Sequence, residues 1–164
     1  MARAAEQAAA ADALPHHSLG LIRNCSAALP PSLGSRLEAV LPGASVLPTY
    51  AMTEALPICS NRPVDASRDL CSVGPAAGPE VAVAATSGEL VHGEEEGEVL
   101  VRGACVFSGY ETREHSADAN AAAFHAGGWL RTGDRGWVDG EGHFRLSGRF
   151  KEVCEWEVCA GRHS

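Results

Sequence analysis

Residues 19–47 have the sequence LGLIRNCSAALPPSLGSRLEAVLPGASVL, in which two short apolar stretches stand on either side of a helical pattern. Apolar residues between Leu29 and Val40 recur at intervals typical of one face of an α-helix. The prolines at 30 and 31 suit the first turn of that helix, and the Pro-Gly pair at 42–43 ends it. With short strands on both sides, the order strand, helix, strand predicts an α/β sheet.

From about residue 81 the pattern changes to short apolar runs that are joined by turns. Strands are predicted at three places: 81–85, 98–102 and within 137–146. One helix is predicted from Glu111 to Phe124, because a pair of glycines follows at 127–128. This half of the chain is therefore expected to consist mostly of β-structure.

The composition limits the kinds of partner. The chain of 164 residues carries 13 basic and 21 acidic residues, a net charge of -8. This charge argues against nucleic acid or an anionic membrane surface as a general partner, because either requires a positive field. The chain has no apolar run of about 18 residues, so no membrane span is predicted. The oligomeric state is left open.

The cysteines and the N-terminal residues bear on the compartment. Six cysteines are present without a Cys-x-x-Cys pair, which argues against a zinc ribbon or a thioredoxin-type site. Residues 1–18 are rich in alanine and lack the apolar middle of a secretory signal, so we expect a disordered leader. Reduced cysteines and a cytoplasmic or peroxisomal protein, rather than a secreted one, are therefore expected.

The sequence YAMTE at residues 50–54 brings an aromatic ring, a hydroxyl and a carboxylate together in one turn. Tyr50 can stack on a base, Thr53 can donate to a phosphate, and Glu54 can hold magnesium. The same turn is also typical of a strand-to-helix junction, with Thr53 as the N-cap and Glu54 near the helix N-terminus. The residues alone leave both interpretations open.

Further segments follow in one order: GEVLVRG at 97–103, SGY at 108–110, WLRTGD at 129–134 and LSGRFKE at 146–152. Together with NCSAALPPSLGSRLEAVLPG at 24–43 and YAMTE, they resemble the AMP-forming acyl-activating enzymes over about residues 19–153. With Met52 before Thr53 and Glu54, the turn resembles that of the acyl-CoA synthetase and 4-coumarate–CoA ligase-like branch of this adenylate-forming superfamily. The resemblance includes oxalate–CoA ligase-like proteins. Leu56 and Pro57 are more apolar than expected of an oxalate pocket, so the acid substrate is left open.

The resemblance implies roles at a nucleotide site. Tyr50 would stack against the adenine, Thr53 would bond the α-phosphate, and Glu54 would hold the magnesium ion that bridges the triphosphate. Thr53 and Glu54 would thus be the catalytic residues. The backbone of one further segment would border the adenine: Ser26, Ala27 and Ala28. The first and third of these depart from the residues that are common in the family.

Residues later in the chain would complete the site. The resemblance implies that Asp134 accepts hydrogen bonds from both ribose hydroxyls, a task that suits a carboxylate with its two acceptor oxygens. Arg149 would add a charge-assisted bond to the nucleotide sugar. Lys151 would lie at the hinge between a large and a small domain. We expect Asp134 at a strand end, where Gly133 allows a ligand to approach the backbone closely.

The resemblance also implies a fold and its divisions. Residues 19–93 would end an α/β adenylate-binding subdomain, 94–150 would form a β-barrel-like subdomain, and 151–164 would begin a hinge with a divergent tail. The family's triphosphate loop and C-terminal lysine have no counterpart in the sequence. We therefore expect a fragment of an ATP-dependent acid–CoA ligase that is inactive alone. The ligands that the resemblance implies are ATP or AMP, Mg²⁺, a small carboxylic acid, and coenzyme A as co-substrate. The alternative is a non-catalytic truncated product with at most weak adenylate binding.

Overall fold

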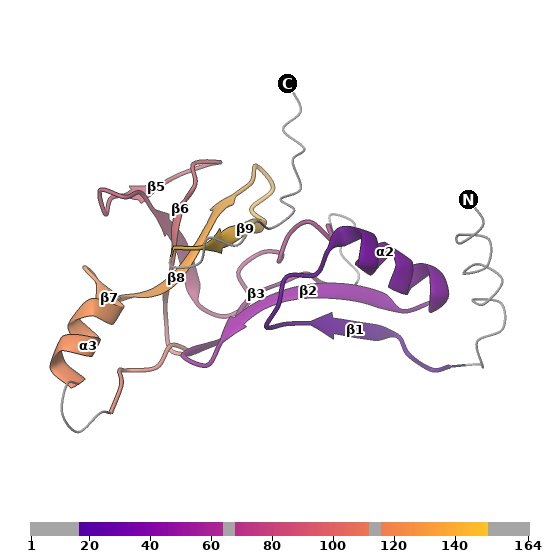
Figure 1. Cartoon of the computed structure of the whole chain (residues 1–164), viewed down its shortest axis with the longest axis horizontal. Helices are drawn as coiled ribbons and strands as arrows, with labels where there is room; N and C mark the ends of the chain where they lie inside the picture. The colour runs from indigo at the N-terminus through magenta and orange to yellow at the C-terminus, as the bar shows by residue number, and fades with distance from the viewer. Residues whose placement is uncertain (1–16, 64–67, 112–115, 151–164) are drawn as a thin grey trace.

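The computed structural model describes residues 17–63, 68–111 and 116–150, and its first part is a small mixed sheet (Figure 1). This sheet has three strands, β1 (Leu21–Asn24), β2 (Ser45–Met52) and β3 (Ala55–Ser60), in the order β1-β2-β3. Strand β1 is parallel to β2, and β2 is antiparallel to β3. Helix α2 (Pro31–Val40) connects β1 to β2 and lies along β2 (Figure 1). The predicted order of strand, helix and strand is confirmed.

Helix α2 begins at the position that its prolines predict. Pro31 is its first residue, where the missing N–H of proline removes no hydrogen bond within the helix. Glu38 fastens the helix to β2, because its carboxylate accepts the N–H of Val46 at 2.8 Å and forms an ion pair with Arg68. The hydrogen bond from Arg68 holds the pKa of Glu38 below its ordinary value, so the pair is charged at neutral pH.

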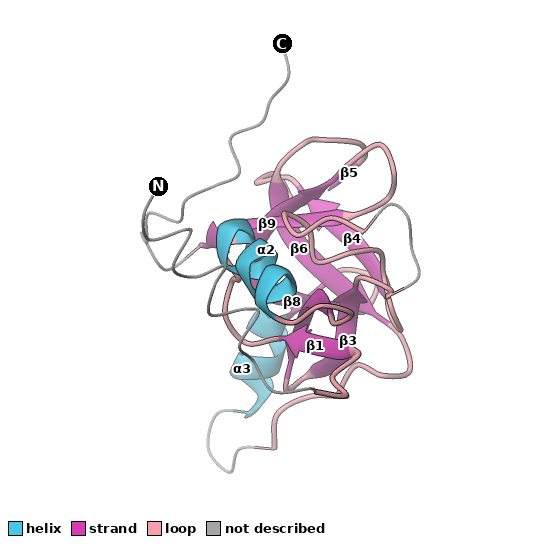
Figure 2. Cartoon of the chain, turned by 90° about the vertical axis from the view of Figure 1, so that its right-hand side faces the viewer, coloured by secondary structure: helices cyan, strands magenta, loops and turns pink. Residues whose placement is uncertain are grey.

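The second sheet has six strands in the order β5-β4-β6-β8-β7, with β9 also paired to β8. Its strands are β4 (Glu80–Ala84), β5 (Leu90–Val91), β6 (Gly97–Arg102), β7 (Phe124–His125), β8 (Trp129–Val138) and β9 (Phe144–Arg149). All pairs are antiparallel, and the sheet curls into a half-barrel (Figure 2). Helix α3 (Ser116–Ala123) lies at one end of the molecule (Figure 1). Neither helix of the described residues is long and apolar enough to cross a membrane.

The two sheets share one hydrophobic core, which agrees with the predicted class of an α/β part joined to a barrel-like part. Tyr50 and Ile58 of the first sheet belong to the same buried cluster as Val83, Val99 and Leu130 of the second. Ile58, Val99 and Leu130 are at most 1% exposed. Burying one such side chain contributes about 1.5–3 kcal/mol, so each sheet depends on the other for its core.

A loop that follows β3 connects the first sheet to the second. Gly74 in this loop has φ +82° and forms an isolated bridge with Phe144 of β9. A Cβ at this position would lie 2.3 Å from the backbone nitrogen of Asn61, so only glycine fits. The side-chain amide of Asn61 donates to the carbonyl of Ser72 at 2.8 Å, which holds the loop in place.

Strand β3 is not predicted by the sequence pattern. Pro57 lies within it and has no N–H to donate, and a proline normally argues against a strand. The turn at Thr53 and Glu54 consequently connects two antiparallel strands. The interpretation of this turn as a strand-to-helix junction is therefore wrong.

The predicted helix at 111–124 is longer than the observed one. Helix α3 ends at Ala123, and Phe124 and His125 form β7 instead, because both pair with β8. The prediction for 112–115 lies outside the described residues. Strand β8 begins at Trp129, well before the strand that the pattern predicts from residue 137.

The predicted boundary between residues 93 and 94 stays a prediction. Strands β4 and β5, which precede it, pair with each other. Strand β4 also pairs along its whole length with β6, which follows the boundary. The change from one sheet to the other thus falls between β3 and β4.

Candidate functional site

A polar cluster around the buried carboxylate of Asp134 brings together three of the predicted residues from three different strands. Tyr50 of β2 donates its hydroxyl to Oδ2 of Asp134 in β8 at 2.5 Å. Arg149, the last residue of β9, donates Nε to Oδ1 of the same carboxylate at 2.9 Å. Asp134 and Arg149 face each other directly in the β8–β9 ladder. Both oxygens of the carboxylate therefore have a fixed direction.

A bulge in β8 carries Asp134. Leu100 of β6 pairs with Arg131, and Glu98 pairs with Arg135, so an advance of four residues along β8 corresponds to two residues along β6. Gly133 takes up the irregularity with φ +74°. Asp134 thus lies in the interior of a ten-residue strand, and its predicted place at a strand end is wrong.

Thr132 supports the bulge from within the sheet. Its hydroxyl donates to the carbonyl of Val99 at 2.7 Å and accepts the N–H of Asp134 at 3.1 Å. These two bonds satisfy backbone groups that the irregular ladder would otherwise leave without partners. Thr132 is 9% exposed and was not predicted as a site residue, although its place directly before Gly133 and Asp134 is a signal for it.

Burial decides the electrostatics of this cluster. Tyr50 and Asp134 are each 8% exposed, and a buried carboxylate is stable only with donors around it. Burial of the phenol, reinforced by the charge of Asp134, raises the pKa of Tyr50 far above its ordinary value. The hydroxyl therefore stays protonated and remains a donor to the carboxylate.

The turn between β2 and β3 carries Thr53 and Glu54. Thr53 is exposed, whereas Glu54 is half-buried and is held by a neighbouring segment. Tyr110 donates its hydroxyl to Oε1 of Glu54 at 2.8 Å, and the N–H of Phe107 donates to the Glu54 carbonyl at 2.8 Å. The bond to Glu54 raises the pKa of Tyr110. Tyr110 lies in the SGY segment but was not predicted as a site residue.

Glu54 suits a magnesium ion. Its Oε2 has no hydrogen bond among the described residues, and magnesium prefers carboxylate oxygens together with phosphate oxygens and water. No group of three or more His, Cys, Asp or Glu side chains forms a metal site in the part of the chain that the structure describes. Glu54 therefore offers such an ion one carboxylate oxygen.

Residues 26–28, which are predicted to border the adenine, follow shortly after the end of β1. Asn24, the last residue of β1, pairs with Pro48 of β2 in parallel register. The three residues are all exposed, and the first has a positive φ of 74°: Ser26, Ala27 and Ala28. No hydrogen bond between the described residues joins them to Tyr50 or Asp134. The predicted hinge residue Lys151 lies outside the described residues.

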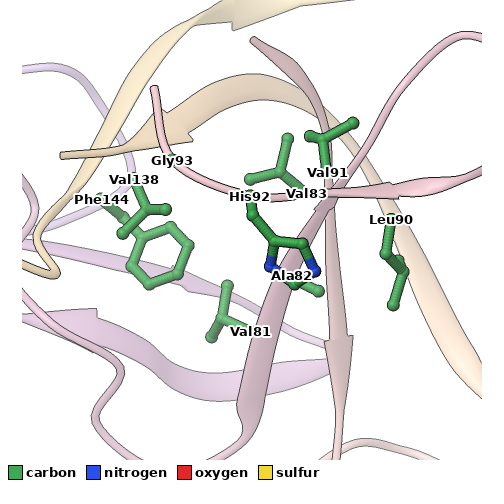
Figure 3. Close-up of a pocket in the computed structure, with 9 residues that line it drawn as sticks. All are labelled: Val81, Ala82, Val83, Leu90, Val91, His92, Gly93, Val138 and Phe144. Carbon is green, nitrogen blue, oxygen red and sulfur yellow. The ribbon is translucent and has the colours of Figure 1, made fainter. Parts of the chain in front are cut away.

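A pocket of about 170 Å³ lies elsewhere, on the half-barrel (Figure 3). Apolar side chains of β4, β5, β8 and β9 surround it, and they include Val81, Val91, Val138 and Phe144. His92 is the one titratable residue among those that line it. None of the predicted site residues contributes to its wall, so the candidate site is the polar cluster rather than this pocket.

Residues 1–111 match the family model described as AMP-binding enzyme. The chain is 42% identical to the oxalate–CoA ligase of Arabidopsis thaliana over 82% of this chain and 26% of that protein. It is similar in structure to the ATP-bound MatB of Rhodopseudomonas palustris, with a TM-score of 0.72 and 31% identity over 82% of this chain and 26% of that one. A malonyl-CoA ligase in complex with methylmalonyl-CoA and AMP gives a TM-score of 0.66 and 36% identity over 80% of this chain and 27% of that one. The chain thus spans about a quarter of the length of these relatives.

Proposed function

Because the chain belongs to the AMP-binding enzyme family, we propose that Tyr50, Asp134 and Arg149 bind the sugar and base of an adenine nucleotide. The observation that carries the proposal is the buried Asp134 carboxylate, which two donors hold in one orientation. Each carboxylate oxygen has about two lone-pair sites, and one on each is taken, so two remain for the ribose hydroxyls. The stacking of adenine on the Tyr50 ring stays a prediction, and the structure adds a role for its hydroxyl in holding Asp134.

The proposed reaction of the intact enzyme is the activation of a small carboxylic acid. A carboxylate oxygen of the acid attacks the α-phosphate of ATP, and pyrophosphate leaves. The thiol of coenzyme A then attacks the acyl carbon, loses its proton, and AMP leaves as the thioester forms. This reaction class is supported by the similarity to the Arabidopsis oxalate–CoA ligase, to the ATP-bound MatB and to the malonyl-CoA ligase with AMP bound.

The remaining predicted residues keep supporting roles in this proposal. The exposed hydroxyl of Thr53 would donate to the α-phosphate, and the backbone at 26–28 would border the adenine. Glu54 would hold Mg²⁺, which when bound neutralises charge on the triphosphate. Lys151 would act at the hinge.

We further propose that the 164-residue chain alone binds nucleotide without forming a thioester. The relatives that are named as ligases are about three times as long, since the 137 residues that align with the Arabidopsis protein cover 26% of it. A non-catalytic binding protein is thus the second candidate. Incubation of the 164-residue chain with ATP, magnesium, coenzyme A and a panel of acids tests the proposed inactivity, because thioester formation above background would contradict it.

Calorimetric titration with ATP tests the nucleotide site. We expect Asp134→Ala to weaken ATP binding by at least tenfold, because two hydroxyl-to-carboxylate bonds are lost. Asp118→Ala, which removes the same charge from an exposed position of α3, should bind as the parent does. 2′,3′-Dideoxy-ATP lacks both hydroxyls and should bind the parent and Asp134→Ala alike. Equal ATP affinities of parent and Asp134→Ala, in protein with unchanged circular dichroism, would remove Asp134 from the site.

A further inference from the structure

Glu54 is fastened at two points to the segment at 105–110. The N–H of Phe107 donates to its carbonyl at 2.8 Å, and the Tyr110 hydroxyl donates to its Oε1 at 2.8 Å. Ala55, the next residue, forms an antiparallel bridge with Val106. The bridge and the backbone bond fix the turn, whereas the Tyr110 bond acts on the carboxylate itself. The direction of this carboxylate therefore depends on the position of Tyr110.

Tyr110 is itself fixed by α3. Asn120 accepts the N–H of Tyr110 at 2.7 Å through Oδ1 and donates Nδ2 to the Tyr110 carbonyl at 3.2 Å. The Tyr110 ring packs edge-on against Phe107 at 4.7 Å between centroids, and Phe107 stacks on Phe124 directly after α3. Gly109 has φ +143°, and a Cβ there would come within 3.0 Å of Asn120 Oδ1. The backbone before Tyr110 is thus shaped for this contact.

We propose that Tyr110 is a positioning residue for Glu54, and that Asn120 of α3 holds Tyr110 in place for this task. The relay from Asn120 through Tyr110 to Glu54 sets the affinity for the magnesium-bound nucleotide. This inference rests on the proposed function, in which Glu54 is the protein ligand of the ion.

The geometry suits such a task. The bond to Oε1 leaves Oε2 without a hydrogen bond among the described residues, so one oxygen is fixed while the other is available. Magnesium demands near-octahedral geometry and takes few protein ligands, so a carboxylate that already points correctly has less freedom to lose on binding. A phenol donates a hydrogen bond without bringing a charge, so the carboxylate keeps its attraction for a cation.

A purely structural bond is the competing interpretation. In that case Tyr110 would only help to hold the segment 105–110 on the turn. Its loss would lower the stability of the fold and would weaken nucleotide binding equally with and without magnesium. A positioning role instead predicts a loss that is confined to the contribution of magnesium, and this difference can be measured.

The experiment measures ATP binding to the 164-residue chain by calorimetry, once with excess magnesium and once with EDTA. The ratio of the two dissociation constants is the magnesium enhancement. Tyr110→Phe keeps the ring on Phe107 and removes only the hydroxyl, and Asn120→Ala removes both bonds to the Tyr110 backbone. Ser147→Ala is the matched control, because it removes another hydroxyl-to-carboxylate bond, to Glu96.

We expect Tyr110→Phe to reduce the magnesium enhancement about three- to tenfold and to leave binding in EDTA unchanged. Asn120→Ala should reduce it less, and the double variant should lose no more than Tyr110→Phe, because both residues act through one carboxylate. Ser147→Ala should retain the enhancement of the parent. An unchanged enhancement in Tyr110→Phe, or equal losses with and without magnesium, would overturn the relay alone. A parent chain whose ATP binding does not respond to magnesium would overturn the proposed role of Glu54 and the relay with it.

Discussion

Replacing each of the two tyrosines of the chain by phenylalanine would show how strongly burial stabilises the Asp134 cluster. Both hydroxyls donate to a carboxylate, from Tyr50 to Asp134 at 2.5 Å and from Tyr110 to Glu54 at 2.8 Å. Tyr50 is 8% exposed, whereas Tyr110 is 38% exposed. The two substitutions thus delete the same chemical group and differ in its surroundings.

The expected magnitudes follow from this difference. A hydrogen bond to a charged group contributes about 1.5–3 kcal/mol when it is buried, so Tyr50→Phe should lower the free energy of unfolding by that amount. For a chain of this length such a loss lowers Tm by about 3–12 °C. The Tyr110 bond is open to solvent, and exposed polar pairs contribute less than about 1 kcal/mol. Tyr110→Phe should therefore leave the stability nearly unchanged.

Urea denaturation followed by circular dichroism measures both values. The m-values of the parent and the two variants must agree, since a changed slope would mean that a variant unfolds from a different state. Equal losses for the two variants would refute the argument from burial. A loss below about 0.5 kcal/mol for Tyr50→Phe would refute the claim that its hydroxyl stabilises the buried carboxylate.

Three further outcomes are expected. Gly133→Ala should lower the free energy of unfolding by about 1–2 kcal/mol, measured by urea denaturation, because φ is +74° and an added Cβ meets no atom within 4 Å. Glu54→Gln should lower the pKa of Tyr110 towards its ordinary value, measured by ultraviolet absorbance of the tyrosinate, because the bond to the charged carboxylate raises that pKa. The pKa of Tyr50 is raised in the folded chain. The stability that the protonated hydroxyl contributes is therefore fully present below pH about 10 and is lost as the pH rises through the folded pKa. Tyr50→Phe should therefore lose stability less steeply than the parent above pH 10, by up to about 1.4 kcal/mol per pH unit in denaturation experiments.

The first sheet shows which parts of the fold the sequence predicts. The helical spacing from Leu29 to Val40 and the prolines before it are local signals, and α2 follows them closely. Strand β3 has no such signal, because Pro57 breaks the donor pattern and the strand is held by its partner β2. Phe124 similarly follows a helical pattern but joins β7, because pairing with β8 outweighs local preference.

The sequence predicts Tyr50, Asp134 and Arg149 as candidate residues, but neither Thr132 nor Tyr110 and none of the hydrogen bonds between them. Tyr50, Thr53 and Glu54 are neighbours in the sequence, so one turn reveals them together. Tyr50 and Asp134 are 84 residues apart, and only the packing of one sheet against the other brings the hydroxyl onto the carboxylate. Tyr110 has no distinguishing spacing, since its partner Asn120 is selected by the position of α3 rather than by a motif.

The residues of the candidate site also explain why the sequence pattern does not predict the first half of β8 as a strand. The inward positions of this half-strand are Leu130, Thr132, Asp134 and Gly136, and all four are buried. A strand with a purely structural task would place apolar residues there, which is the alternation that sequence patterns detect. A carboxylate at an inward position is stable only where donors surround it, and Tyr50 and Arg149 provide them. The pattern therefore fails at Asp134, the residue for which we propose a nucleotide-binding role, as expected where a functional residue departs from local consistency.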